Sequence, residues 1–165
     1  MKPIDKISLA KSINFIQSLT PEDKIKYCEN IHQLQPHAFL TIVALMQEGL
    51  PVPMLDHGIC LLMVIHHVFY SHCRSLPLIT EDLLRDALEG NVAMLQSIEQ
   101  GWLTHDKAIS LYPERTLLTF IFGYMKDNNL GFPCKENERL ISRIKILLDA
   151  YAKAKSLAMN NFQLH

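Results

Sequence analysis

The chain has 165 residues, of which 48% are hydrophobic and 20% are charged. This composition is typical of one globular domain and excludes an intrinsically disordered chain. Lys and Arg number 16 and Asp and Glu number 17, so the net charge is −1. Because no overall charge draws the protein to phosphate groups, we expect neither nucleic acid nor a membrane as a partner.

Apolar residues recur at spacings of three and four along the chain, and no Asn-Gly or Asp-Gly turn separates alternating apolar residues. This pattern predicts an all-α fold in a single domain, residues 1–165. We expect about nine helices around a buried central helix. Their predicted ranges are 4–19, 21–34, 37–48, 54–73, 81–89, 92–100, 105–111, 114–127 and 137–158.

Helix starts and ends carry local signals. Three threonines precede acidic first turns and are predicted to cap helices at their N-termini, where backbone N–H groups lack partners: Thr20, Thr80 and Thr104. Three glycines follow apolar stretches and are predicted to end helices: Gly49, Gly90 and Gly101.

The central segment is the most apolar part of the chain. Residues 57–73 contain no Asp, Glu, Lys or Arg, but a membrane-spanning helix needs about 20 mostly apolar residues. Histidines interrupt this segment, and polar groups are costly in lipid. We therefore predict a buried helix at 54–73, and we expect the acidic helices of residues 81–99 and the basic final helix to form an outer layer.

Four cysteines lie far apart in the sequence and form no Cys-x-x-Cys pair: Cys28, Cys60, Cys73 and Cys134. A chain of this length has enough core to fold without disulfides. The N-terminal Asp5 and Lys6 occupy positions where a secretion signal would be apolar. These features predict reduced thiols and a cytoplasmic location.

The central helix also holds candidate metal ligands. His57 and Cys60 lie one turn apart, and His67 continues the same stripe further along the helix. These side-chain types bind zinc or manganese, although a complete site needs three or four ligands. The alternative interpretation is a core helix whose imidazoles each bond to a neighbour, with no cofactor.

The order of His66, His67 or His72, then His105-Asp106, then Asp127 or Asp149 resembles that of the His-Asp metal-dependent phosphohydrolases. The resemblance implies metal-dependent hydrolysis at these residues. In that family the His-Asp pair ends a buried helix, whereas Thr104 predicts that His105 and Asp106 begin one. No other part of the chain carries the resemblance, and we assign no family.

The final helix presents a continuous apolar seam, with residues at alternating spacings of four and three: Leu140, Ile144, Leu147, Tyr151, Ala154 and Ala158. Such a seam packs either inside the same domain or against a second copy. We predict the second arrangement, a homodimer with its interface at Leu140, Ile144, Leu147 and Tyr151. Lys145 and Asp149 have the spacing of an ordinary ion pair on a solvated helix face.

The sequence lacks the motifs of nucleophilic and phosphate-binding sites, namely Gly-x-Ser-x-Gly, Gly-x-Gly-x-x-Gly and Gly-Lys-Ser/Thr. We therefore predict a non-enzymatic, all-helical protein-interaction or assembly module. The alternative is a metal-binding protein or metal-dependent hydrolase that uses the histidine-rich central helix.

Overall fold

The computed structural model describes residues 3–73, 75–131 and 134–162, and within these ranges it contains eight α-helices and no β-strand. The helices are α1 (Lys6–Ser18), α2 (Pro21–Leu34), α3 (Pro36–Gln47), α4 (Val52–His72), α5 (Glu81–Glu99), α6 (His105–Ser110), α7 (Arg115–Asp127) and α8 (Lys135–Phe162). The predicted all-α fold is therefore confirmed, with one helix fewer than expected.

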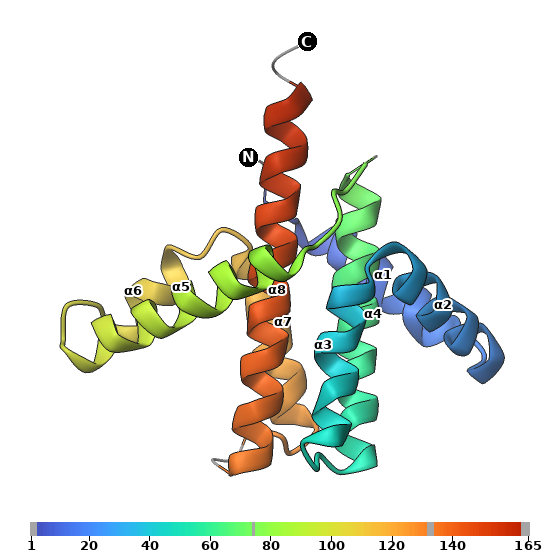
Figure 1. Ribbon diagram of the computed structural model, residues 1–165, viewed down its shortest axis with the longest axis horizontal. Coiled ribbons are helices and arrows are strands. Elements are labelled where there is room, and N and C mark those ends of the chain that lie inside the picture. Colours follow the sequence, from blue (N-terminus) through green and yellow to red (C-terminus); the bar gives the residue numbers. More distant parts are fainter. Residues whose placement is uncertain (1–2, 74, 132–133, 163–165) are drawn as a thin grey trace.

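An upright bundle forms the middle of the molecule (Figure 1). Helices α3, α4, α7 and α8 run along its long direction, and α8 extends beyond the others at the end that holds both termini. Helices α5 and α6 project from one side of the bundle, and α2 projects from the opposite side.

The predicted threonine caps and glycine ends explain five of the helix boundaries. The side chains of Thr20, Thr80 and Thr104 each accept a hydrogen bond from a backbone N–H in the first turn of α2, α5 and α6. Gly49 and Gly101 have φ angles of +85° and +74°, a conformation that favours glycine at a helix end. These five local predictions are confirmed.

Gly90 does not end a helix, and the prediction of separate helices at 81–89 and 92–100 is wrong. Helix α5 runs without interruption from Glu81 to Glu99. A glycine inside a helix costs about 1 kcal/mol relative to alanine. The Thr80 cap and the packing of α5 across α8 outweigh that cost.

Helices α4 and α8 contact each other in the core, together with α3 and α1. Gly58 permits the close approach of these helices, because a Cβ atom there would lie 2.9 Å from Leu140 Cδ1 and 3.3 Å from Ile42 Cγ2. The central position of α4 agrees with the prediction. The expectation that the final helix belongs to an outer layer is wrong, since the seam of α8 lies inside the bundle.

Helix α4 is long and apolar enough to cross a membrane by length and composition, with a mean hydropathy of 1.5. In the fold, 56% of that apolar window is buried inside the chain itself. A core helix meets the same criterion of length and composition, and more than half of this window lies in the core of the chain.

Candidate functional site

His57 and Cys60 lie near the side of α4 that faces α7. His57 Nδ1 lies 2.9 Å from the Tyr124 hydroxyl oxygen, and the two rings meet edge to face. Burial and the neighbouring Cys60 thiol raise the pKa of Tyr124, so this hydroxyl stays protonated. The imidazole of His57 thus already has a hydrogen-bond partner within the protein.

His67 lies on a different side of the bundle. Its Nδ1 is 2.9 Å from Ser12 Oγ of α1, and its ring stacks on Phe15 with centroids 4.3 Å apart. The predicted set of His57, Cys60 and His67 is therefore not brought together. Within the described residues, no group of three or more His, Cys, Asp or Glu side chains is placed to hold a metal ion.

His66 of α4 is buried in the core, where its side chain contacts α8. Its Nδ1 lies 2.9 Å from the Tyr151 hydroxyl oxygen, and its ring stacks on Tyr70. Burial, with a smaller effect from His67, lowers the pKa of His66 to about 4. The ring is therefore neutral near pH 7, and its role in the structure is to pair with the buried Tyr151 hydroxyl.

The remaining described residues of the phosphohydrolase-like order also form no group that could hold a metal ion. Thr104 caps α6, which places Asp106 in an exposed first turn as predicted; the side chain of His105 lies outside the described residues. His72 bonds through Nδ1 to the Val68 carbonyl oxygen of its own helix. The arrangement that the resemblance implies is absent from the described side chains.

The apolar seam of α8 is covered within the chain. Leu140, Ile144, Leu147 and Tyr151 have no exposed surface, and they pack against the central helices. A second copy cannot touch these four side chains while the fold stays intact. The homodimer itself stays a prediction, but the seam that motivated it is accounted for by the core of one chain.

A polar cluster joins α8 to the projecting helices, and two of its members, Lys145 and Asp149, were predicted to lie on a solvated helix face. Lys145 Nζ bonds to Asp149 Oδ2 at 2.7 Å, and these side chains are only 15% and 16% exposed. The Tyr112 hydroxyl donates to Asp149, and the Lys145 ammonium lies 4.3 Å from the Tyr112 ring centroid. Burial and Asp149 together raise the pKa of Tyr112. The ion pair is confirmed, but its solvated setting is wrong.

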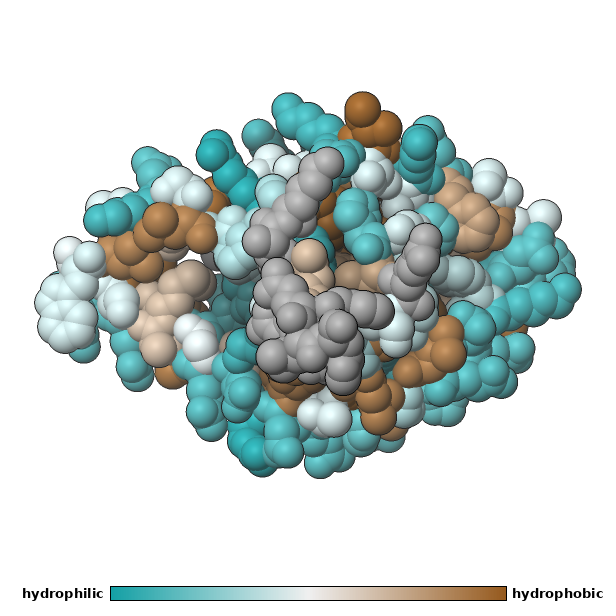
Figure 2. Space-filling model, turned by 90° about the horizontal axis from the view of Figure 1, so that it is seen from above, coloured by the Kyte–Doolittle hydropathy of each residue, from teal (hydrophilic) through white to brown (hydrophobic). Residues whose placement is uncertain are grey.

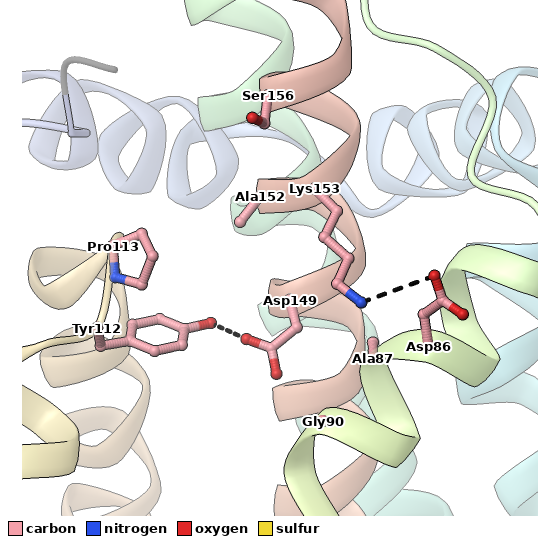
Figure 3. A pocket seen from close by; sticks show the side chains of 9 residues that line it. All are labelled: Asp86, Ala87, Gly90, Tyr112, Pro113, Asp149, Ala152, Lys153 and Ser156. Atoms are coloured by element: carbon pink, nitrogen blue, oxygen red, sulfur yellow. Dashed lines mark hydrogen bonds and ion pairs between the residues drawn. The ribbon is translucent and has the colours of Figure 1, made fainter. Parts of the chain in front are cut away.

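This cluster borders a cavity of about 280 Å³ (Figure 3). Tyr112 and Asp149 point toward one another from opposite sides, and Lys153 reaches across to Asp86 of α5 at 3.9 Å. The acidic helix and the basic helix therefore face each other. The four-residue spacing of Lys145 and Asp149 predicted their ion pair. No local sequence signal predicted that Tyr112 would pack over this pair.

A second buried polar contact was not predicted. Glu114 and Lys155 form an ion pair of 2.7 Å with side-chain exposures of 0% and 3%. The other carboxylate oxygen of Glu114 accepts a hydrogen bond of 2.8 Å from the Ile4 backbone N–H. This contact fixes the chain before α1 against the start of α7 and the end of α8.

The projecting helices carry exposed apolar side chains. We call this surface the wing and define it by Leu95 of α5, Trp102 between α5 and α6, Ile109 and Leu111 at the end of α6, and Phe122 of the neighbouring α7. Leu95, Ile109 and Phe122 line one shallow cavity of about 170 Å³, and the Trp102 side chain is 79% exposed. Hydrophobic residues reach the surface on the side where these helices project (Figure 2).

Comparison with protein-family models, with curated proteins and with solved structures finds no match to this chain.

Proposed function

We propose that this protein is a non-enzymatic assembly module whose copies form a homodimer through the wing. The observation that carries the proposal is the exposure of the five apolar side chains of the wing, which lie on the projecting part of the chain and on the neighbouring helix α7. Apolar surface gathered in one place is typical of a site that binds another protein.

The charge of the wing supports a second copy as the partner. Residues 91–111 contain four of the five wing residues, and the charged residues in this segment are Glu99, Asp106 and Lys107, which gives a net charge of −1. In a two-fold symmetric contact, each patch meets itself, so a charged patch repels its copy and a neutral one does not. An apolar surface with a small net charge therefore suits self-association better than it suits a strongly charged partner.

The non-enzymatic part of the proposal is supported by the histidines of α4. His57, His66 and His67 each have a hydrogen-bond partner on another helix, in three different directions. An active site requires such groups to converge on one reacting atom. As part of the same proposal, the protein works in the cytoplasm, where its four free thiols stay reduced.

The alternative of a metal-binding protein or metal-dependent hydrolase stays a prediction. Elemental analysis of tag-free protein checks it directly, since bound zinc or manganese near one ion per chain would revive it. Hydrolase activity that depends on the added metal would contradict the assembly proposal.

Trp102 provides the test of the dimer because it is the only tryptophan in the chain. We expect sedimentation velocity to show a shift from monomer to dimer with rising concentration, and the Trp102 emission to move to shorter wavelength in parallel as the indole leaves water. Leu95→Glu should abolish both changes, because it places two like charges in the symmetric contact.

Ile7→Glu is the matched control. Ile7 is a similarly exposed apolar residue, but it lies on α1, away from the wing. This variant should dimerise as the unmodified protein does. Two results would contradict the wing as the interface. One is an unmodified protein that sediments as a monomer at every concentration, and the other is equal weakening of dimerisation by Leu95→Glu and Ile7→Glu.

A further inference from the structure

A larger cavity lies on the other side of the molecule, between α2 and α4. Its volume is about 650 Å³, against about 280 Å³ for the cavity of Figure 3. Small-molecule sites in proteins occupy roughly 300 to 1,000 Å³. We call this space the α2–α4 cavity and define its interior by Ile16, Ile25, Phe39, Ile59 and Met63.

The cavity exists because α2 is only partly packed on the bundle. Ile31 is the one side chain of α2 that is buried, whereas Ile25, two turns earlier, stays exposed. The helix is held at its end by the short connection to α3, and its start projects away from α4 (Figure 1). Ile25, near the start of α2, therefore faces open space, whereas the same position of a fully packed helix would contact side chains of the core.

The interior is apolar and adaptable. Ile16 and Met63 are buried and form its inner part, while Ile59 and Phe39 are half-buried along its walls. Methionine and phenylalanine accommodate apolar groups of different shape, because the thioether chain is flexible and the ring face is broad. The interior fits the hydrocarbon part of a ligand.

The mouth of the cavity is charged. Glu29 of α2 and Asp56 of α4 are both exposed and border the cavity from its two sides, and neither carboxylate forms an ion pair within the described part of the chain. Among the described residues of the lining, Lys24 is the single Lys or Arg side chain. Two carboxylates against one ammonium leave an excess of negative charge at the opening.

Two aromatic rings also line the cavity. The ring of His32 meets the ring of Phe39 with centroids 5.3 Å apart, and both residues line the cavity. Aromatic faces attract cations, and more strongly when the cation is partly removed from water. Carboxylates and an aromatic face in the lining of one cavity therefore favour the same ligand group, an organic cation.

We propose that the α2–α4 cavity binds an amphiphilic amine, with its hydrocarbon part against Ile16, Ile59 and Met63 and its ammonium group at Glu29 and Asp56. This site is separate from the wing, and the proposal does not depend on dimerisation. Anionic amphiphiles of the same length are disfavoured, because their head group would face the two carboxylates.

The cavity contains its own chemical reporters, Cys28 and Cys60, which are half-buried in its lining. Burial raises the pKa of the Cys28 thiol, which slows its alkylation without preventing it. Cys134 is exposed and does not line the cavity, so it serves as an internal control. A ligand in the cavity shields the first two thiols and leaves the third unaffected.

The experiment compares nonylamine, nonanol and nonanoic acid, each below its micelle concentration, on the full-length protein. Binding is measured by titration calorimetry, and the alkylation of each cysteine by N-ethylmaleimide is followed by mass spectrometry. We expect nonylamine to bind most tightly and to protect Cys28 and Cys60 but not Cys134. The double variant Glu29→Gln, Asp56→Asn should weaken nonylamine binding by about tenfold and leave nonanol binding unchanged.

Glu22→Gln is the matched control, because Glu22 is an exposed carboxylate on the same helix that does not line the cavity. It should bind nonylamine as the unmodified protein does. Tighter binding of nonanoic acid, or equal binding of all three compounds, would overturn the assignment of a cationic ligand. If none of the three compounds changes the alkylation of Cys28 and Cys60, the cavity is not a binding site. The proposal is also overturned if, without any ligand, the protection of these two thiols increases with protein concentration, because a second copy of the chain would then occupy the cavity.

Discussion

Replacing Lys155 with Met removes the ammonium group that faces Glu114 in the interior. The pair is 2.7 Å long, and neither side chain has appreciable exposed surface. In the variant, the Glu114 carboxylate stays buried while it keeps the Ile4 N–H as a donor. Removing one partner of a buried ion pair costs about 3 to 5 kcal/mol, because the remaining charge has lost its compensation.

A loss of this size is a large share of the roughly 5 to 15 kcal/mol that stabilises a typical domain. Urea unfolding followed by far-ultraviolet circular dichroism measures it. We expect the midpoint to fall strongly in Lys155→Met, with little change in the slope of the transition. Adding Glu114→Gln should restore most of the stability, because the neutral amide still offers an oxygen to the Ile4 N–H.

Lys153→Met is the control for this experiment. Lys153 lies on the same helix and forms a longer ion pair of 3.9 Å with Asp86, and both side chains are substantially exposed. Exposed pairs contribute about 0 to 1 kcal/mol. If Lys155→Met destabilises the protein no more than Lys153→Met does, or if the double variant is no more stable than Lys155→Met, the reasoning about a buried charge is refuted.

Three further predictions follow from the packing. Gly90→Ala should stabilise the protein by about 1 kcal/mol, because Gly90 lies inside a helix and the added Cβ would meet nothing within 4 Å. Gly58→Ala should destabilise the protein, because the added Cβ would lie 2.9 Å from Leu140 Cδ1 in a packed core. The thermal unfolding temperatures of the two variants should shift in opposite directions. Leu147→Asp should unfold the chain instead of giving a soluble monomer, because Leu147 is fully buried within its own domain; a folded variant by near-ultraviolet circular dichroism would contradict this. The free energy of unfolding should fall by roughly 3 kcal/mol as pH drops from 6.5 to about 4, because the unfolded chain then binds a proton that buried His66 does not; His66→Gln should lose this part of the pH dependence, and an unchanged slope would contradict it.

Local signals predicted the parts of the fold that local physics determines. The hydroxyl of Thr80 caps α5 through contacts within one helical turn, and Gly49 ends α3 through its own backbone angle. Gly90 shows the limit of this reasoning, since its sequence setting resembles that of Gly49. What distinguishes them is the packing of α5 across α8, which lies outside any short sequence window.

The candidate site depended on contacts between distant residues. The spacing of His57 and His67 correctly placed them along one helix. The hydrogen-bond partner of each imidazole comes from a different helix, namely Tyr124 for His57 and Ser12 for His67. In the same way, the spacing of the α8 residues predicted a seam, but it carried no information about which helix covers Leu147. Periodicity identifies a buried face, whereas the identity of its cover depends on the whole chain.

The two buried polar contacts offer a physical reason why apolar side chains of the wing stay exposed. Tyr112 and Glu114 lie just before α7, and each is joined to α8, through Asp149 and Lys155 respectively. Hydrogen bonds and close ion pairs are directional, whereas apolar packing is not. The connection between α6 and α7 is therefore fixed at two points on α8, and in this arrangement Trp102, between α5 and α6, stays on the surface.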